Sequence, residues 1–226
     1  MCGRYNIITD AKALYDAFLV EAELGAAPLA RYNAAPATAQ LVILNECGHR
    51  VARWHHWGLI PHWAKDKTIG YKTINARGES VAAKPAYRAA FRQRRCLVPA
   101  TGFYEWKAEA GGKQPYLIRR TDGSLIAFAG LWESWAGPAG EVRSFTIITT
   151  EPNALMARIH DRMPVIVPCE RYARWLDPLL RDPAQIQPMI APYPDGELQA
   201  VPVGRRVNNA RNQGAELIEP IGAALA

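Results

Sequence analysis

The sequence has few cysteines, few lysines and no long apolar run. Its four cysteines, Cys2, Cys47, Cys96 and Cys169, lie far apart, so it contains no CxxC pair of the kind that binds zinc or cycles between redox states. No stretch approaches the length of a membrane-spanning helix, and the N-terminus lacks the pattern of a signal peptide. We therefore expect no zinc pair, disulfide or membrane association, and a location in the reducing cytoplasm.

The composition is that of a globular protein with a modest excess of positive charge. The 226 residues are 49% hydrophobic and 21% charged, with a formal net charge of +6. Of the 27 basic residues, 20 are Arg and 7 are Lys, and Arg binds phosphate in a bidentate manner better than Lys does. This excess permits a polyanionic partner, although coding bias in an Ala-rich and Arg-rich chain would produce the same composition.

Hydrophobic periodicity and turn residues predict an α+β fold with a mostly antiparallel, barrel-like sheet and flanking helices, because consecutive hairpins are interrupted by helices. We expect irregular stretches over residues 28–36 and 61–72. Helices are expected over residues 9–24, 80–95, 153–160, 169–180 and 183–190. Strands are expected over residues 40–44, 51–59, 96–106, 115–120, 125–134, 144–150 and 165–167.

Two of the predicted helices have specific sequence signals. The first carries apolar residues at Leu14, Phe18 and Leu19, which suggests one buried face. The second has Ser80 as a candidate N-cap, although Pro85 restricts where a regular helix can run.

Cys2 stands directly after the initiator Met, which gives it a chemistry that no interior cysteine has. Removal of Met1 before a small residue leaves Cys2 as the N-terminus, with an amine and a thiol on adjacent carbons. The α-amine titrates at about 7.7 to 8.0, so part of it is neutral and nucleophilic at pH 7. Such an amine condenses with an aldehyde to a Schiff base, and the thiol closes onto the imine carbon to form a stable five-membered thiazolidine. Burial of the thiol in the core is the alternative interpretation, and the other three cysteines are expected there.

Eight stretches are richer in polar and special residues than a plain core requires. They are MCGRY (1–5), RYNAAP (31–36), WGLIPHWAKD (57–66), INARGES (74–80), RRCLVPATGFYEW (94–106), FAGLWE (128–133), IHDRMPVIV (159–167) and VNNARNQGAELIEP (207–220). In this order, this set resembles the SOS-response-associated peptidase (SRAP) family, or abasic site processing proteins. The resemblance covers nearly the whole chain and implies one SRAP domain over residues 1–226, with a core over 2–220 and a short C-terminal tail.

The resemblance implies a reaction and the residues that carry it. Members of the family capture the ring-opened aldehyde of an abasic site in single-stranded DNA as a covalent thiazolidine, which shields the lesion. Carried over to this sequence, Cys2 is the nucleophile and Asn75 orients the sugar. Glu105 transfers protons during sugar opening, and His160 assists imine formation or protonates the sugar oxygen. The aromatic neighbours of Glu105 could raise its pKa by desolvation.

The resemblance also points to residues that contact DNA, namely Arg4, Asn33, Trp63, Arg77 and Arg162. The arginines would hold phosphates, and Trp63 would stack on exposed bases. A further basic run, made of Arg88, Arg92, Arg94 and Arg95, adds charge but is more typical of a solvated helix face. The implied partner is single-stranded DNA that contains abasic sites, bound by a monomer on the nucleoid, with no metal, no cofactor and no membrane.

The chain departs from the family pattern at a few positions. Ala64 replaces a second aromatic residue that follows Trp63 in some relatives, which puts a two-ring wedge in doubt. Ala34 stands where a β-branched residue is frequent, and Gly78, Glu79 and Ser80 stand where AET is common. None of these departures falls on the four chemical positions.

Three other functions fit parts of the sequence. Cys, His and Glu could form a thiol peptidase, including one limited to self-cleavage before Cys2. Arg and Trp alone could form a non-covalent module for single-stranded DNA. A zinc site from His55, His56 and His62 is a third possibility, but adjacent histidines on a strand point to opposite faces.

Overall fold

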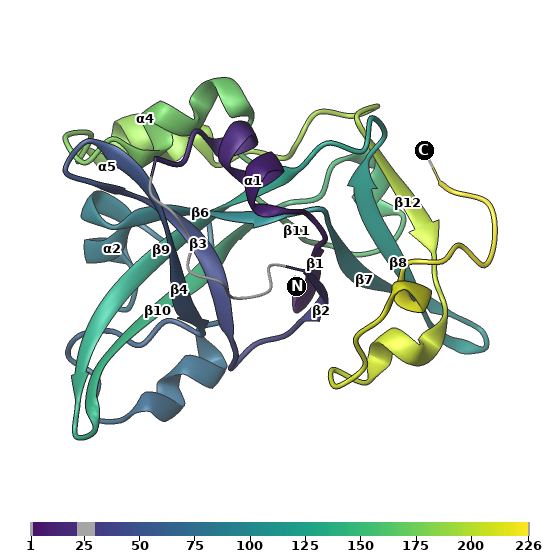
Figure 1. The fold of residues 1–226 in the computed structure, drawn as a ribbon, viewed down its shortest axis with the longest axis horizontal. Coiled ribbons are helices and arrows are strands. Elements are labelled where there is room, and N and C mark those ends of the chain that lie inside the picture. Colours follow the sequence, from purple (N-terminus) through teal and green to yellow (C-terminus); the bar gives the residue numbers. More distant parts are fainter. Residues whose placement is uncertain (1, 22–29, 226) are drawn as a thin grey trace.

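The computed structural model describes residues 2–21 and 30–225, and it contains two β-sheets surrounded by short helices (Figure 1). The strands are β1 (Arg4–Ile7), β2 (Arg31–Ala34), β3 (Ala39–Glu46), β4 (His49–Trp57), β5 (Asn75–Arg77), β6 (Arg95–Ala100), β7 (Gly102–Glu109), β8 (Gly112–Arg120), β9 (Ile126–Gly137), β10 (Gly140–Thr150), β11 (Met163–Pro164) and β12 (Leu198–Pro202). The α-helices are α1 (Ala11–Phe18), α2 (Arg88–Gln93), α3 (Ala154–Ala157), α4 (Tyr172–Leu176) and α5 (Pro183–Ile186). The 3-10 helices are η1 (Lys67–Lys72), η2 (Cys169–Arg171), η3 (Gln187–Met189), η4 (Arg205–Asn208) and η5 (Ala215–Leu217).

Five strands close into a barrel. They pair in the order β10, β4, β3, β6 and β9, and β9 pairs with β10 again. The contact between β4 and β10 is parallel, whereas the other four contacts of the ring are antiparallel. Closure leaves none of these strands as an open edge. The C-terminal half of β10 extends beyond its contact with β4 and pairs with β5 and β11.

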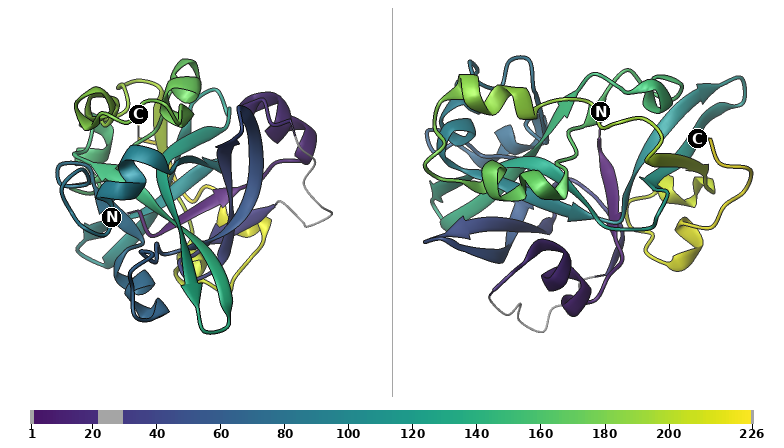
Figure 2. Two further views of the ribbon diagram at one scale, coloured as in Figure 1. Left: turned by 90° about the vertical axis from the view of Figure 1, so that its left-hand side faces the viewer. Right: turned by 90° about the horizontal axis from the view of Figure 1, so that it is seen from above.

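The second sheet contains five antiparallel strands in the order β12, β8, β7, β1 and β2. In Figure 1 the N-terminus and β1 lie between the barrel on the left and strands β7, β8 and β12 on the right, and the view from above in Figure 2 places them in the same position. The predicted α+β fold with a mostly antiparallel, barrel-like sheet is therefore confirmed.

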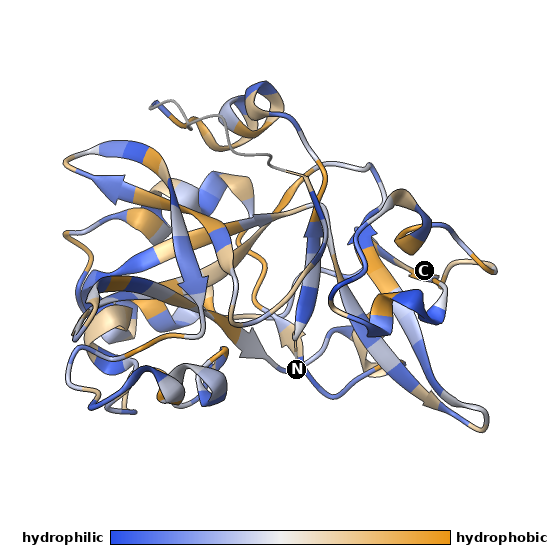
Figure 3. Cartoon of the chain, turned by 60° about the horizontal axis from the view of Figure 1, so that its bottom comes forward, coloured by the Kyte–Doolittle hydropathy of each residue, from blue (hydrophilic) through white to orange (hydrophobic). Residues whose placement is uncertain are grey.

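Aromatic packing joins β1 to the barrel. The ring of Tyr5 lies 5.3 Å from that of Trp57 on β4 and 5.8 Å from that of Phe128 on β9. Phe128 also meets Phe103 of β7 edge to face. Figure 3 colours the chain by hydropathy, and apolar residues follow one another along the buried parts of β3, β6 and β9. The buried aromatic cluster fixes β1 and therefore the position of the residues that precede it.

The first helix is shorter than predicted. Asp10 caps it by accepting a hydrogen bond from the backbone of Ala13, and Leu14 and Phe18 are buried as expected. Leu19 ends the helix in a left-handed conformation with φ of 53°. Its side chain is 64% exposed, so its assignment to the buried face was wrong. Residues 22–24 of the predicted helix lie outside the described residues.

The later helices are also shorter than predicted. Only α2 forms within residues 80–95, because the segment around Pro85 makes turns and Ser80 caps no helix. Within residues 169–180, η2 and α4 form and the helix stops at Leu176. The next residue, Asp177, precedes a proline and is extended.

The strands that form consecutive hairpins were predicted correctly, whereas short strands that pair with distant parts of the chain were not. Residues 96–106 form β6 and β7 in succession, and residues 28–36 contain β2 where an irregular segment was expected. Cys96 is buried as predicted, but Cys47 and Cys169 are exposed and are not core residues. Cys47 occupies the turn between β3 and β4 with φ of 53°, so it projects at a hairpin end.

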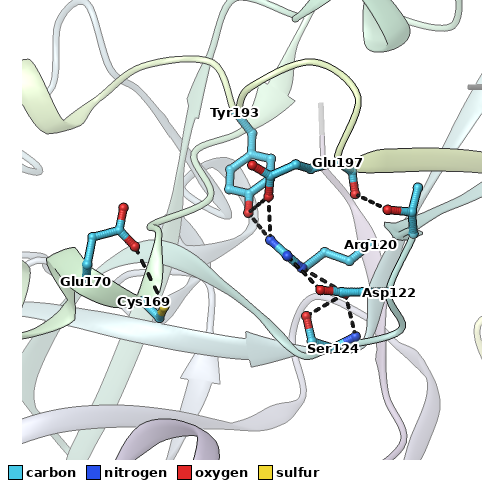
Figure 4. A network of polar contacts seen from close by, with 8 residues as sticks. Arg120, Asp122, Ser124, Cys169, Glu170, Tyr193 and Glu197 are labelled. Atoms are coloured by element: carbon cyan, nitrogen blue, oxygen red, sulfur yellow. Dashed lines mark hydrogen bonds and ion pairs between the residues drawn. The ribbon is translucent and has the colours of Figure 1, made fainter.

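A polar network ties the end of β8 to the loop before β12 (Figure 4). Arg120 donates to Asp122 at 2.7 Å, to Glu197 at 2.7 Å and to the Tyr193 hydroxyl. These contacts raise the pKa of Arg120 and lower that of Asp122. The donors and acceptors of this network satisfy one another, so we assign it a structural role.

Within the described part of the chain, no helix has both the length and the apolar character needed to cross a membrane.

Candidate functional site

Cys2 lies two residues before β1 and is fully buried. Strand β1 pairs with β7 so that Arg4 lies opposite Tyr104, which brings the N-terminal end of β1 beside Glu105. Burial raises the pKa of the Cys2 thiol well above its ordinary value, and the Glu105 carboxylate raises it further. The thiol is therefore neutral in this site, and a partner must accept its proton when the sulfur reacts.

Asn75 holds the main chain of Cys2. It begins β5, opposite Ile147 of β10, and its Nδ2 donates a 2.9 Å hydrogen bond to the carbonyl oxygen of Cys2. The hydroxyl of Tyr87 in turn donates to the backbone oxygen of Asn75 at 3.2 Å. The Oδ1 atom of Asn75 is buried and accepts no hydrogen bond from the described residues. It is a free acceptor beside Cys2, suited to a hydroxyl group of a bound sugar.

Glu105 is the buried carboxyl group of the site. Its burial raises its pKa above the ordinary value, and the nearby His160 partly offsets that shift. One carboxylate oxygen, Oε1, accepts a 3.3 Å hydrogen bond from the backbone of Trp106. A carboxyl group with a raised pKa can donate and recover a proton near neutral pH, as general acid catalysis requires.

His160 lies just after α3, and its backbone N–H bonds back to Met156. Its Nδ1 accepts from the backbone N–H of Arg162 at 3.0 Å and lies 2.8 Å from Oδ1 of Asp161. Nδ1 thus faces one donor and one acceptor: it accepts from Arg162 when it carries no proton and donates to Asp161 when it carries one. The structure thus relates Cys2, Asn75, Glu105 and His160 to one another, through one hydrogen bond and two longer-range electrostatic interactions.

Arg4 and Asn33, both predicted to bind DNA, meet directly. Nη1 of Arg4 donates to Oδ1 of Asn33 at 3.0 Å. Arg4 is half-buried, and its guanidinium lies 5.9 Å from the ring of Trp106. Asn33 is buried, and its amide nitrogen donates to the carbonyls of Val207, Asn209 and Asn212. Asn33 therefore anchors a C-terminal segment, residues 205–213, which we call the strap.

Arg162 and Arg77 both adjoin Thr149 of β10. Arg162 is largely buried and forms a bidentate ion pair with Glu79, with distances of 2.5 and 3.0 Å. Its Nη2 also donates to the carbonyl of Thr149 at 2.7 Å, and Thr149 is the β10 partner of Arg77. Arg77 is exposed. Arg77 can meet a phosphate directly, whereas Arg162 must first share its guanidinium with Glu79.

Trp63 is exposed on the turn before η1, with 51% of its surface accessible. It borders a shallow cavity of about 260 Å³ that Lys65 and Lys72 also line. The indole N–H of Trp135 donates to the carbonyl of Ala64 at 2.8 Å, which fixes this turn to the barrel. An exposed ring on a fixed turn with lysines nearby suits base stacking.

The basic run of residues 88–95 does not form one solvated face. Arg88 and Arg92 are exposed, but Arg94 pairs with the buried Glu133 at 2.7 Å. Arg95 is buried, and its guanidinium donates to four backbone carbonyls, so it adds no surface charge.

The three histidines considered for zinc do not form a metal site. Among the described residues, no group of three His, Cys, Asp or Glu side chains is arranged to hold a metal ion. His55 is buried beside Trp132, and His62 contacts Glu133 at 3.4 Å.

Comparison with known proteins places the chain in a family. Residues 1–210 match the family model described as SOS response associated peptidase (SRAP). The chain belongs to the SRAP family. Relatives of this SRAP protein include the abasic site processing protein YoqW of Bacillus subtilis (strain 168), which is 42% identical over 226 residues, with 97% of this chain and 99% of YoqW covered. The abasic site processing protein YedK of Escherichia coli (strain K12) is 30% identical over 228 residues, covering 98% of this chain and 100% of YedK.

Solved structures show the same fold. A protein from Bacteroides thetaiotaomicron superposes on this SRAP chain with a TM-score of 0.87 at 24% identity, covering 97% of this chain and 99% of that one. A protein from Bordetella bronchiseptica gives a TM-score of 0.74 at 26% identity, covering 90% of this chain and 100% of that one.

Sequence reasoning missed the residues that support the site of this SRAP chain. Tyr87 holds Asn75, Glu79 holds Arg162, and Asn208 of the strap accepts a 2.7 Å hydrogen bond from the indole of Trp106. The density of Asn and Gln in the stretch VNNARNQ was the available signal, because amide side chains can bind backbone and polar groups at once.

Proposed function

We propose that this protein senses abasic sites in single-stranded DNA and, after removal of Met1, crosslinks to them through Cys2, which shields the lesion during the DNA damage response. The carrying observation is that Asn75 holds Cys2 beside the buried Glu105, with His160 next in line. The names of the relatives YoqW and YedK support the abasic site as substrate. The reaction needs a free thiol, so we infer action in the reducing cytoplasm, on the nucleoid when bound to DNA. A monomer suffices because one lesion requires one Cys2.

The first step joins the α-amine of Cys2 to the lesion. His160 protonates the ring oxygen of the sugar hemiacetal while the Glu105 carboxylate takes the proton of the 1′-hydroxyl, so the bond between C1′ and the ring oxygen breaks and the C1′ aldehyde is exposed. The neutral amine attacks C1′, and the carbinolamine loses its hydroxyl group as water when Glu105 supplies a proton. A Schiff base remains between the cysteine nitrogen and C1′. Oδ1 of Asn75 accepts a hydrogen bond from a sugar hydroxyl and orients C1′ toward the amine.

The second step closes the ring. The thiol sulfur adds to the imine carbon, and its proton passes to the nitrogen by way of the Glu105 carboxylate. The overall reaction forms one C–N and one C–S bond and releases one water, with no oxidant or reductant. Loss of the imine also removes the group that would promote strand scission by β-elimination, so the crosslink protects the strand.

The electrostatics of Cys2 favour this reaction over thiol peptidase chemistry. A cysteine peptidase relies on a thiolate with a lowered pKa. Here burial and Glu105 both raise the pKa of the Cys2 thiol. A neutral thiol is compatible with an order in which the amine reacts first and the sulfur follows.

The test uses single-stranded DNA that carries one abasic site, incubated with protein whose N-terminus is Cys2. A heat-stable adduct that needs no borohydride is expected on a denaturing gel. A tetrahydrofuran analogue, which cannot open to an aldehyde, should give none. Protein with one extra residue before Cys2 should also form none, because its Cys2 nitrogen is an amide.

Cys2→Ser is the matched chemical control, since serine keeps the amine but closes a far weaker ring. An undiminished heat-stable adduct with this variant contradicts the thiazolidine. Cleavage of a peptide substrate without any DNA adduct would favour the peptidase, and equal affinity for intact and abasic DNA without an adduct would favour a non-covalent binding module.

A further inference from the structure

The strap fixes one side of the Arg4 guanidinium. Besides its bond to Asn33, Nη1 of Arg4 donates to the carbonyl of Val207 at 2.8 Å, and Nη2 donates to the carbonyl of Asn208 at 3.1 Å. These bonds use three of the five guanidinium hydrogens. Among the described residues nothing accepts the remaining two, which are on Nε and Nη2. In a planar guanidinium these two hydrogens point the same way, as the bidentate recognition of a phosphate requires.

One side chain of the strap reaches the aromatic residue beneath Arg4. Oδ1 of Asn208 accepts a 2.7 Å hydrogen bond from Nε1 of Trp106, and the Arg4 guanidinium lies over the ring of Trp106, 5.9 Å from its centre. Asn208 therefore contacts Arg4 through its backbone and the residue beneath Arg4 through its side chain. Trp106 is also the residue next to Glu105, so the strap is connected to the chemical centre by one peptide unit.

We propose that Asn208 is a positioning residue for DNA binding: its bond to Trp106 holds the strap in the register that presents the free edge of Arg4 to a phosphate of the bound strand. The inference rests on the proposed function, because it assumes that single-stranded DNA binds at Arg4. It assigns a role to the C-terminal VNNARNQ stretch, which the chemistry of Cys2 does not use.

The contact can be removed without opening the core. Asn208 is exposed, and the bond to Trp106 is the only one that its side chain makes with the described residues. The remainder of the strap stays anchored by Val207, which is buried, and by the amide of Asn33. Asn208→Ala is therefore expected to fold, with a melting temperature within a few degrees of the wild type.

The experiment is a double-mutant cycle of Asn208→Ala and Trp106→Phe, measured by affinity for intact single-stranded DNA over a range of salt concentrations. Phenylalanine keeps a ring beneath Arg4 and removes the N–H donor. Each single variant should weaken binding about three- to tenfold and flatten the salt dependence, because one phosphate contact is lost. The double variant should bind DNA no more weakly than the single variant of lower affinity, because the two substitutions remove the same hydrogen bond.

A second measurement reports the contact itself. In a ¹⁵N-labelled sample, the indole N–H of Trp106 should exchange slowly with solvent in the wild type and at least tenfold faster in Asn208→Ala. Asn209→Ala is the matched control, because its side chain caps only the backbone of Arg211 and leaves both Trp106 and Arg4 untouched. It should change neither the indole exchange nor the affinity.

Additive effects in the cycle, or unchanged indole exchange in Asn208→Ala, overturn the positioning role. The outcomes also separate this inference from the proposed function. A wild type that crosslinks abasic DNA while Asn208→Ala binds normally refutes only the positioning role. A wild type that forms no adduct, with non-additive losses of affinity in the cycle, refutes only the covalent function. A wild type that does not bind DNA refutes both.

Discussion

The side-chain amide of Asn75 donates a 2.9 Å hydrogen bond to the backbone carbonyl of Cys2. This bond joins β5, which is attached to the barrel, to the start of β1, which belongs to the other sheet. Cys2, the proposed nucleophile, is thus held by Asn75 from one sheet and lies within the electrostatic influence of Glu105 on β7 of the other. A site built at the junction of two sheets depends on their relative position, which the aromatic cluster around Tyr5 fixes.

Asn75→Asp should slow crosslinking strongly and lower the stability of the fold only slightly. A carboxylate cannot donate to the Cys2 carbonyl, and it places a negative charge near Glu105. We expect the crosslinking rate at saturating DNA to fall about 10²-fold, similar to the loss of one preorganised donor in other enzymes. Single-turnover kinetics on a denaturing gel measure this rate. Tyr87→Phe, which removes only the support of the Asn75 backbone, should cost less, and a wild-type rate in Asn75→Asp contradicts the orienting role.

Glu105→Gln should slow the crosslinking reaction and make the folded protein more stable at neutral pH. Burial raises the pKa of Glu105 above its reference value of 4.5. The folded state therefore binds this proton more tightly than the unfolded state does. As pH rises from about 4.5 through the folded pKa, the wild type loses stability, because its buried carboxyl must ionise. Glutamine abolishes that loss, so the melting temperature of the variant should exceed that of the wild type at pH 7 and match it near pH 4.

The same variant should lose the proton transfer that Glu105 is proposed to perform. Crosslinking at pH 7 should slow by about 10²- to 10⁴-fold, the usual contribution of a general acid. A variant that is stabilised and keeps its full rate would show that the burial of Glu105 has no catalytic purpose.

Local sequence patterns predicted the hairpins well. They did not predict the structural features that depend on contacts between residues far apart in the chain. The polar ECGH turn between two apolar segments, with alternation in the second one, predicts the β3–β4 hairpin from local sequence alone. The parallel contact of β4 with β10 that closes the barrel joins residues nearly 90 positions apart, Ser144 with His56, and no local pattern signals it. Strands as short as β2 and β5 form because neighbours supply their hydrogen bonds.

The family resemblance predicted the candidate site residue by residue. It did not predict the residues that hold those side chains in place. Arg94 and Arg95 are adjacent and chemically identical, yet one pairs with Glu133 and the other is buried among backbone carbonyls of α2 and α4. Asn33, which is predicted to contact DNA, is buried beneath the strap and bonds to its backbone. Which polar groups face a ligand and which hold the frame depends on packing, which one sequence does not reveal.

Glu79→Gln should tighten the binding of single-stranded DNA if Arg162 contacts a phosphate. The bidentate pair with Glu79 occupies the guanidinium, and the carboxylate itself repels the DNA backbone. Because Arg162 is largely buried and stays bonded to Thr149, it keeps its place without Glu79. We expect affinity to rise about two- to fivefold at low salt, with a smaller gain at high salt. Fluorescence anisotropy with intact single-stranded DNA measures this change.

Arg162→Ala and Arg77→Ala provide the comparison for Glu79→Gln. Each should weaken binding and reduce the salt slope by about one, because each removes one phosphate contact. Weaker binding by Glu79→Gln would show that Glu79 orients Arg162 for DNA rather than competing with it.

His55 should make the protein lose stability in mild acid. Burial lowers its pKa to about 4 from 6.5, and neither ring nitrogen bonds to a described residue. Between these two pH values the unfolded state binds more protons than the folded state, so stability decreases as pH falls through this window. A difference of this size corresponds to about 3 kcal/mol at pH 4. The substitution His55→Leu removes the titrating group. The free energy of unfolding of this variant should therefore change less with pH than that of the wild type, as measured by urea titrations at pH 7 and pH 4.5. Equal slopes for the two proteins would contradict the lowered pKa of His55 in the folded state.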